Sequence, residues 1–456
     1  MRVMMTGIAL VLGASFAVAQ EPTKFSAVLA GHAVLPAKTK MAPPADAPED
    51  FKVSGRFAAP NGQRVDTLGA IEGTSFLSAK DAPRKTGFTL PIDGQPVQGF
   101  SGIKTVGDGT YWVLTDNGFG AKANSPDALL VFHKVRPDWA TGNVEMLASH
   151  FLHDPDRKVP FRITTETTQK RYLTGADFDI ESIQFIGDHV WFGDEFGPYL
   201  LKTDKSGKVV SVFETMVDGK LARSPDHFAV STPAVPGGPV AFNVRRSRGY
   251  EGMAASKDGV FLYPLLEGPI WDADAKDWEK TNGKEVLRIL EFSVADGKWT
   301  GRHWKYPLDL AGNNIGDFNM LDATTGLIIE RDNGEGSASR ACPEGKPAAD
   351  CFNVPARFRR IYKIEMTDAN AGGLVRKIGY IDLMDIDDPK KLAKQGGADG
   401  KFTFPFVTIE DVDVVNATQI IVANDNNFPY SAGREPQRQD DNEFILLDVA
   451  DLLKAK

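Results

Sequence analysis

Cysteine and histidine are scarce in this chain, which limits the metal sites that it can form. Of its 456 residues, two are cysteine and seven are histidine. Zinc and other transition metals favour thiolate and imidazole ligands, so the sequence disfavours a transition-metal centre. Acidic residues outnumber basic ones and give a formal net charge of -9, which argues against nucleic acid or an anionic membrane as a partner.

The motifs of nucleophilic hydrolases and of nucleotide-binding proteins are missing as well. The sequence has no Gly-x-Ser-x-Gly segment and no glycine-rich phosphate loop, so it gives little support to a serine nucleophile or a bound nucleotide. Ser101 and Lys104 fit the pattern Ser-x-x-Lys. That pattern functions on a helix, whereas the residues around Ser101 are typical of a strand.

Long apolar runs are confined to the first residues. The run Ile8–Phe16 follows Arg2 and precedes Ala17-Val18-Ala19, an order typical of a secretory signal peptide that ends at residue 19. A transmembrane anchor, the alternative, requires about 20 apolar residues. We therefore predict a mature chain that starts at Gln20, has no membrane span, and is periplasmic or secreted.

The two cysteines and the first part of the mature chain predict local features. Cys342 and Cys351 flank a segment with proline and glycine, which predicts one disulfide in a surface loop, with a metal site as the weaker alternative. Residues 20–50 end in a stretch rich in proline and alanine and predict an extended, mobile linker. We expect a single domain over residues 51–450 and a short helix over 449–456.

Five segments of the sequence share one pattern. Each has an apolar strand that opens with small or acidic residues, a turn, a second strand rich in Val, Ile and aromatic residues, and closing acidic or amide residues. They start at Gly99, Phe178, Gly249, Ile315 and Thr408. This pattern is typical of a β-hairpin.

Further strands between these hairpins predict four-stranded units. The additional strands are Leu200–Asp204, Val209–Phe213, Leu287–Phe292, Arg360–Ile364 and Phe444–Asp448. Repeated four-stranded units predict an all-β fold, a β-propeller with four-stranded blades. We expect six blades, the sixth from strands near Phe51–Phe57 and Leu68–Phe76; five or seven blades, a β-sandwich or two all-β domains are the alternatives.

Acidic residues recur where each hairpin begins and ends. Because the start of the first strand and the end of the second lie at one edge of a hairpin, we expect these carboxylates to meet around the axis. The candidate metal ligands are Glu181, Asp194, Glu195, Glu251, Asp317, Asp332, Glu410 and Asp425. Their mutual repulsion requires a divalent cation, basic partners or raised pKa values. Oxygen ligands favour Ca²⁺, with another divalent cation as the alternative; turn caps and solvated strand ends are the structural alternative.

Arginines lie close to these acids in the sequence. Arg248 precedes Gly249-Tyr250-Glu251-Gly252, and Arg331 lies between Glu330 and Asp332. Arginine binds phosphate and carboxylate groups with two hydrogen bonds. Arg248 and Arg331 are therefore candidate anion-binding residues, unless they only neutralise the acids.

Several of these motifs resemble one family of exported bacterial proteins, the phytase-like family described as "esterase-like activity of phytase". The resemblance covers Phe51–Asp448 and is carried by Gly99–Gly118, Asp177–Gly197, Arg248–Gly252, Ile409–Asp413 and Asn424–Phe428. It implies a calcium-dependent phosphoesterase on a β-propeller. The Asp-Asp-Pro-Ala-type motif of β-propeller phytases is missing, because Asp387-Asp388-Pro389 continues with Lys390-Lys391, so phytate is disfavoured as the substrate.

The sequence is compatible with two functions. The first is an exported metal-dependent hydrolase of a small-molecule ester, such as a phosphate ester, with Glu251 and Glu410 as catalytic candidates. The second is a non-catalytic propeller that holds a structural Ca²⁺ and binds a small molecule, a glycan or a protein. Activity with and without a chelator distinguishes them.

Overall fold

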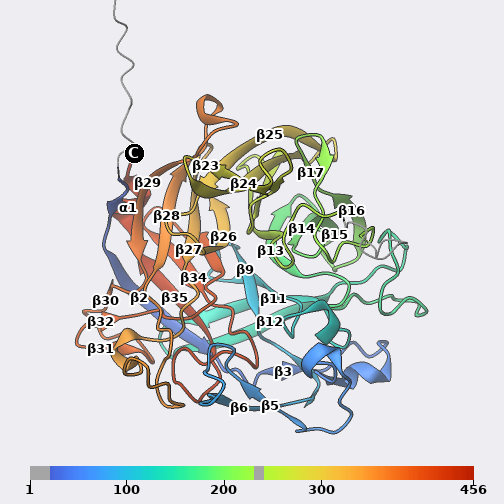
Figure 1. Cartoon of the computed structure of the whole chain (residues 1–456), viewed down its shortest axis with the longest axis horizontal. Coiled ribbons are helices and arrows are strands. Elements are labelled where there is room, and N and C mark those ends of the chain that lie inside the picture. Colours follow the sequence, from blue (N-terminus) through green and yellow to red (C-terminus); the bar gives the residue numbers. More distant parts are fainter. Residues whose placement is uncertain (1–20, 231–240) are drawn as a thin grey trace, which may run out of the picture.

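The computed structural model describes residues 21–230 and 241–456 (Figure 1). The predicted signal peptide lies outside the described residues. The all-β prediction is confirmed: strands dominate the described chain, and its one α-helix, α1 (Ala450–Lys454), lies in the predicted C-terminal segment. In the described part of the chain, no helix is long and apolar enough to cross a membrane.

All five predicted hairpins form, and each continues into two further strands. The first three sheets are made in chain order by these strands: β9 (Phe100–Thr105), β10 (Tyr111–Thr115), β11 (Val131–Asp138) and β12 (Asn143–Phe151); β13 (Ile180–Ile186), β14 (His189–Asp194), β15 (Tyr199–Asp204) and β16 (Val209–Glu214); β19 (Tyr250–Ala255), β20 (Phe261–Leu266), β24 (Lys284–Ser293) and β25 (Lys298–Pro307). Positive-φ glycines shape two of the tight turns: Gly187 (φ 60°) and Gly259 (φ 71°) adopt a conformation that side chains with a Cβ disfavour.

The fourth and fifth sheets each include a strand from the start of the chain. The fourth contains β26 (Asn314–Met320), β27 (Thr325–Arg331), β28 (Arg359–Glu365), β29 (Arg376–Asp382) and β1 (Thr23–Lys24). The fifth contains β33 (Asp411–Val414), β34 (Gln419–Ala423), β35 (Asn442–Asp448) and β2 (Ala27–Leu35). The linker prediction for residues 20–50 is wrong over β2. This strand is largely buried and pairs antiparallel with β35, from Val28 opposite Asp448 to Leu35 opposite Asn442. Figure 1 shows β2 (blue) beside β35 (red).

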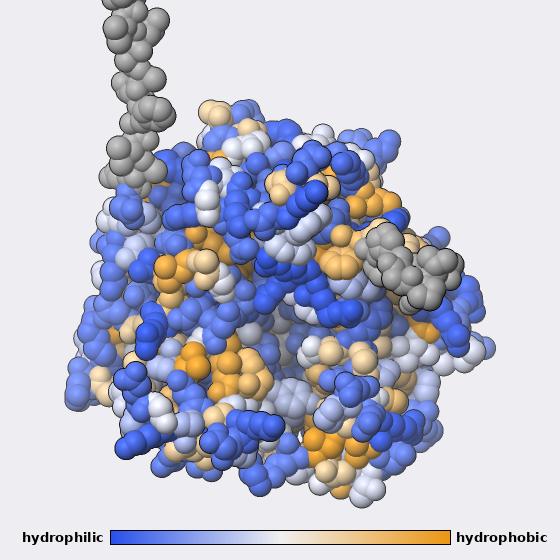
Figure 2. All heavy atoms as spheres, in the orientation of Figure 1, coloured by the Kyte–Doolittle hydropathy of each residue, from blue (hydrophilic) through white to orange (hydrophobic). Residues whose placement is uncertain are grey.

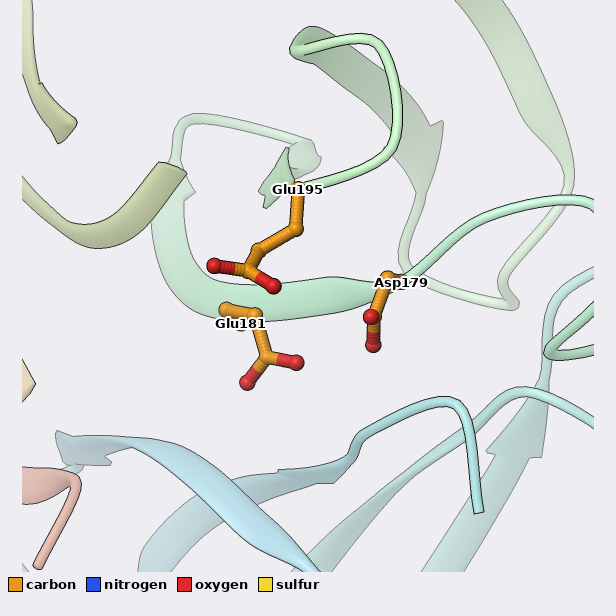
Figure 3. A group of neighbouring side chains, drawn as sticks. All are labelled: Asp179, Glu181 and Glu195. Atoms are coloured by element: carbon orange, nitrogen blue, oxygen red, sulfur yellow. The ribbon is translucent and has the colours of Figure 1, made fainter. Parts of the chain in front are cut away.

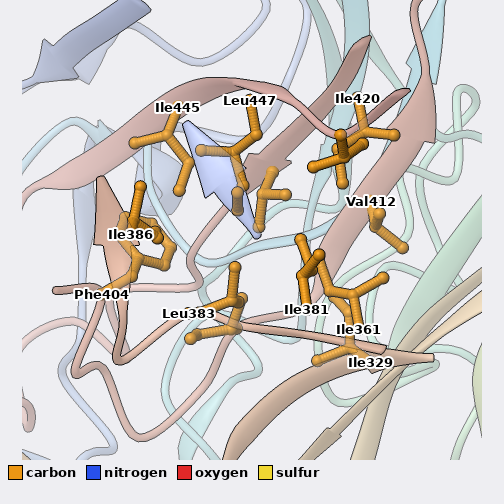
Figure 4. Close-up of a cluster of buried hydrophobic side chains, with 14 of the residues drawn as sticks. Ile329, Ile361, Ile381, Leu383, Ile386, Phe404, Val412, Ile420, Ile445 and Leu447 are labelled. Atoms are coloured by element: carbon orange, nitrogen blue, oxygen red, sulfur yellow. The ribbon is translucent and has the colours of Figure 1, made fainter. Parts of the chain in front are cut away.

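The first strands of the five sheets meet in cyclic order. β9 contacts β13 and β33, β13 contacts β19, β19 contacts β26, and β26 contacts β33. Buried apolar side chains fill the space between each sheet and the next, including the fifth and the first. Successive residues of one strand serve opposite faces: Ile328 packs between the third and fourth sheets, and Ile329 between the fourth and fifth (Figure 4).

The segments expected to add a sixth blade do not form a four-stranded sheet. They contribute short strands to two-stranded sheets, β4 (Val53–Ser54) with β7 (Ile92–Asp93) and β5 (Ile71–Thr74) with β6 (Lys85–Leu90). The remaining short strands are β3 (Lys40–Met41), β8 (Gln95–Pro96), β17 (Met216–Val217), β18 (Lys220–Leu221), β21 (Trp271–Asp272), β22 (Asp277–Trp278), β23 (Lys280–Thr281), β30 (Ile386–Asp387), β31 (Gly397–Ala398) and β32 (Lys401–Phe402). Short 3₁₀ turns are η1 (Glu49–Lys52), η2 (Pro60–Gly62), η3 (Lys122–Asn124), η4 (Ala338–Arg340) and η5 (Asp368–Asn370).

The predicted disulfide is confirmed. Cys342 and Cys351 are bonded in the loop between β27 and β28, and the described chain has no free cysteine. The face seen in Figure 2 is mainly hydrophilic, with a recess near its middle.

Candidate metal centre

The hairpins place one residue each at a shared position near the start of the first strand. We call this the opening position; its residues are Ser101, Glu181, Glu251, Gly316 and Glu410. In β13 and β19 the strand register shifts at Glu181 and Glu251, so each is the extra residue of a β-bulge. Register shifts occur at the same place in the hairpins of Ser101 and Gly316. Bulges re-aim side chains, so the local irregularity is part of how the glutamates are presented.

A second position lies near the end of the second strand of each hairpin; in the four hairpins with a register shift, it directly follows the partner of the residue that precedes the shift. We call it the closing position; its residues are Asp116, Glu195, Glu267, Arg331 and Asp425. In the second sheet, for example, Ile180 pairs with Asp194 and the next residue is Glu195. Because successive strand residues point to opposite faces, Glu195 faces the opening glutamates and Asp194 does not.

Eight carboxyl groups therefore gather at one site, which we call the carboxylate ring. They are Asp116, Asp179, Glu181, Glu195, Glu251, Glu267, Glu410 and Asp425. All but Asp116 are more than nine-tenths buried. Figure 3 shows the carboxylates of Asp179, Glu181 and Glu195 converging, the first two from the start of β13 and the third from the end of β14. The ring unites most of the predicted ligands.

Two sets of three carboxylates have ligand oxygens close enough to share a cation. Within the set Asp179, Glu181 and Glu195, and within the set Glu195, Glu251 and Glu267, one oxygen from each residue lies within 4.8 Å of the others. Glu195 belongs to both. Its Oε1 and the Oε1 of Glu251 are buried and have no hydrogen-bond partner among the described residues. Unpartnered buried carboxylate oxygens are costly, and a hard cation with oxygen ligands would satisfy them. These buried acidic clusters could hold a metal ion.

Burial and mutual repulsion raise the pKa of the ring carboxyls. The pKa of Glu251 lies well above its usual value, because burial disfavours the charged form and Glu410, Glu267 and Glu195 add negative charge. The pKa of Glu181 is raised in the same way by burial and by Asp179 and Glu251. The pKa of Asp425 also lies well above its usual value. Without a cation, burial and repulsion both favour the protonated forms of these groups.

Two arginines supply the positive charge of the site. Nη2 of Arg331 lies 2.6 Å from Oε1 of Glu410, and Arg248 is paired with Glu267. Oε2 of Glu410 accepts a hydrogen bond of 3.3 Å from Oγ of Ser101. Burial raises the pKa of Glu410, and the Arg331 guanidinium opposes that rise. Both predicted anion-binding residues thus contact ring carboxylates.

Three predicted metal ligands are not brought into the ring. Asp194 accepts hydrogen bonds from the backbone N–H groups of Asp179 (2.8 Å) and Gly197 (2.7 Å). Asp317 accepts one from the N–H of Phe318 at 2.7 Å and lies on the side of its strand opposite to Gly316.

Asp332, the third of these residues, accepts hydrogen bonds from the N–H groups of Arg357 and Phe358 and pairs with Arg359. All three carboxylates thus accept hydrogen bonds from backbone N–H groups.

Sequence reasoning left three ring residues without an assigned role. Glu267 and Asp116 were visible as closing acids of their hairpins. Asp179 precedes its strand, and only the repeat of acids in Asp177-Phe178-Asp179-Ile180-Glu181 could have indicated it.

Close backbone packing explains two glycines of the recurring motifs. A Cβ on Gly249 would lie 2.5 Å from the carbonyl oxygen of Glu195, and one on Gly316 would lie 2.3 Å from that of Ile409. Neighbouring sheets therefore touch through backbone at the ring, which brings their carboxylates together.

Comparison with known proteins identifies a family. The family model described as "Phytase-like: Esterase-like activity of phytase" matches residues 95–428, more than half of the chain. No curated protein matches. Among solved structures, the periplasmic gluconolactonase PpgL of Pseudomonas aeruginosa is similar at 11% identity, covering 83% of this chain and 98% of that chain, with a TM-score of 0.29. Saccharomyces cerevisiae Sqt1 is similar at 10% identity, covering 75% and 69%, with a TM-score of 0.27. Structural similarity of this degree supports no inference about function.

Proposed function

Since the chain belongs to the phytase-like family, we propose that it is a metal-dependent hydrolase of a small-molecule ester, with its active site at the carboxylate ring. The observation that carries this proposal is the excess of buried carboxyl groups over arginines, together with the unpartnered oxygens of Glu195 and Glu251. A buried site with this composition is suited to a cation and is expensive to keep without one.

Ca²⁺ is the cation that the donor set favours. The ring residues offer carboxylate oxygens only, and Ca²⁺ takes six to eight oxygen ligands in flexible geometry. Asp179, Glu181, Glu195, Glu251 and Glu267 would hold it, since these residues form the two close sets. When bound, such an ion polarises an ester oxygen and lowers the pKa of a water molecule.

Glu251 and Glu410 have different roles in this proposal. Glu251 has two carboxylate oxygens, of which Oε1 lacks a hydrogen-bond partner among the described residues; one oxygen would bind the cation and the other would accept a proton from an attacking water. Glu410 is held by Arg331 on one oxygen and by Ser101 on the other, so it keeps a fixed position and orients its neighbours. Glu251 is therefore the general base of the proposed reaction.

The fold proposal follows from the cyclic contacts of the first strands. Five sets of four neighbouring strands, of which the fifth is joined to the first where β2 pairs with β12, have apolar packing between each neighbouring pair. They support a closed propeller with five blades, in which β2 completes the last blade. Export is supported by the signal-peptide pattern of residues 1–19 and by the disulfide. The proposed location is the periplasm or the exterior of the cell.

A chelation experiment tests the proposal. The protein is treated with EGTA and supplied with millimolar Ca²⁺, and hydrolysis of p-nitrophenyl phosphate and p-nitrophenyl acetate is measured with the melting temperature. We expect Ca²⁺-dependent hydrolysis of at least one ester and a raised melting temperature, both reduced in Glu251→Gln. Glu291→Gln is the matched control, because Glu291 is buried in β24 and is not a ring residue.

The outcomes separate the candidate functions. A melting temperature that Ca²⁺ raises without hydrolysis of either ester, or of a wider ester panel, would favour the non-catalytic binding protein with a structural ion. An unchanged melting temperature across millimolar Ca²⁺ would remove the metal site.

A further inference from the structure

At one closing position the protein has a positively charged side chain instead of an acid. Four of the five closing residues are acids, namely Asp116, Glu195, Glu267 and Asp425, and the fifth is Arg331. Its place is the same as theirs, because Ile315 pairs with Glu330 and Arg331 follows. A residue of opposite charge at a repeated position therefore faces the ring from the fourth sheet.

The Arg331 guanidinium contacts several carboxylates in the way a bound cation would. Nη2 lies 2.6 Å from Glu410, 3.7 Å from Glu251 and 3.9 Å from Glu267. These three residues come from two other sheets. Arg331 is 4% exposed, and in the described part of the chain its Nε has no hydrogen-bond partner. A guanidinium stays charged at any physiological pH and offers five N–H donors.

The two close carboxylate sets differ in their relation to the arginines. Among the described residues, the set of Asp179, Glu181 and Glu195 makes no ion pair with a basic side chain. In the second set, Glu251 and Glu267 lie 3.7 and 3.9 Å from Nη2 of Arg331, and Glu267 is also paired with Arg248. The protein thus neutralises Glu410 directly and the second set in part, whereas the first set needs an external charge.

We propose that Arg331 is a built-in counter-ion that fills the place of one metal ion, so that cations bind only at the sets formed by Asp179, Glu181, Glu195, Glu251 and Glu267. This inference rests on the proposed metal site and is independent of hydrolysis. It replaces the prediction that Arg331 binds a substrate anion, because a substrate would have to displace Glu410 from a buried contact. It also makes Arg331 a positioning residue that orders Glu410 whether or not Ca²⁺ is present.

Counting bound Ca²⁺ tests the inference. Native mass spectrometry and equilibrium dialysis give the number of Ca²⁺ ions per chain for the wild type, Arg331→Met and Arg331→Lys. We expect Arg331→Met to bind one more Ca²⁺ than the wild type and to show a larger rise in melting temperature on Ca²⁺ addition. Arg331→Lys, which keeps the charge, should bind the wild-type number. Arg288→Met is the control, since Arg288 is buried between Glu279 and Asp218 away from the ring.

Each result decides a separate question. A wild type that binds no Ca²⁺ contradicts the proposed metal site itself. A wild type that binds Ca²⁺ with an unchanged number in Arg331→Met overturns the counter-ion role alone, as does a gain that Arg288→Met shares. Failure of Arg331→Met to fold in millimolar Ca²⁺ also overturns it, because a metal ion should then replace the guanidinium.

Discussion

In the presence of a chelator, the free energy of unfolding of this protein should fall as the pH rises above neutrality. A carboxyl that is protonated in the folded protein and ionised in the unfolded chain lowers the free energy of unfolding by about 1.4 kcal/mol per pH unit, until the folded pKa is passed. Burial raises the pKa of Asp317 to about 8. Between pH 7 and 8.5 this residue alone should reduce the free energy of unfolding by about 1 kcal/mol.

The ring carboxyls add to this loss. The pKa values of Glu181, Glu195 and Glu251 lie well above their usual range, chiefly because of burial. Each group that still holds its proton at pH 8.5 contributes up to about 2 kcal/mol over the same interval. The interval starts at pH 7 because of His133, whose pKa burial lowers to about 3. This histidine makes the free energy of unfolding rise with pH, but only up to its unfolded pKa of about 6.5.

Denaturant unfolding at pH 7.0, 7.75 and 8.5, in EGTA and in millimolar Ca²⁺, measures the effect. We expect a falling free energy of unfolding in EGTA and a Ca²⁺ stabilisation that grows with pH, because bound Ca²⁺ takes the place of protons. Glu251→Gln should reduce the slope in EGTA, whereas Glu49→Gln, at an exposed site, should not. Stability in EGTA that stays level or rises from pH 7 to 8.5 would refute the reasoning.

Three further predictions concern the fold. Gly316→Ala should lower the free energy of unfolding by more than about 2 kcal/mol, because the added Cβ would lie 2.3 Å from a backbone oxygen. Gly373→Ala should be tolerated, because its Cβ would meet only one oxygen, at 3.3 Å. Denaturant unfolding of the two variants tests the difference. Replacing Cys342 and Cys351 by serine should lower the free energy of unfolding by about 2–3 kcal/mol, since the closed loop is short; equal stability of the two forms would contradict this. Deleting Ala27–Leu35 should abolish the cooperative unfolding transition followed by circular dichroism, whereas a linker could be removed without loss.

The five hairpins could be predicted because their signals are local. In each segment the strand alternation, the turn and the closing polar residues lie within one short stretch, and the turn residues Gly187 and Gly259 have the backbone conformations that their sequence suggests. The role of β2 could not be predicted in this way. Its partner β35 lies at the other end of the chain, and no local pattern distinguishes a paired outer strand from a linker.

The ring could be predicted in outline but not in its membership. Asp194 and Glu195 are adjacent acids, and only the strand register decides that Glu195 faces the ring while Asp194 binds backbone N–H groups. The same holds for Arg331 and Asp332. A bulge changes which residues face the axis, and the sequence around Glu251 does not reveal where the bulge occurs.

The pairing of β2 with β35 has a consequence for the order of folding. Strand β2 is synthesised long before β35, yet their register joins Val28 to Asp448 and Leu35 to Asn442. The fifth sheet therefore cannot be completed before β35 has been synthesised, and contacts of such large sequence separation form slowly. We expect the first four hairpins to become protected from hydrogen exchange before β2 does. Until β35 is available, β2 therefore has an unpaired edge, so this strand stays exposed to other partners for most of the time that the chain is being made.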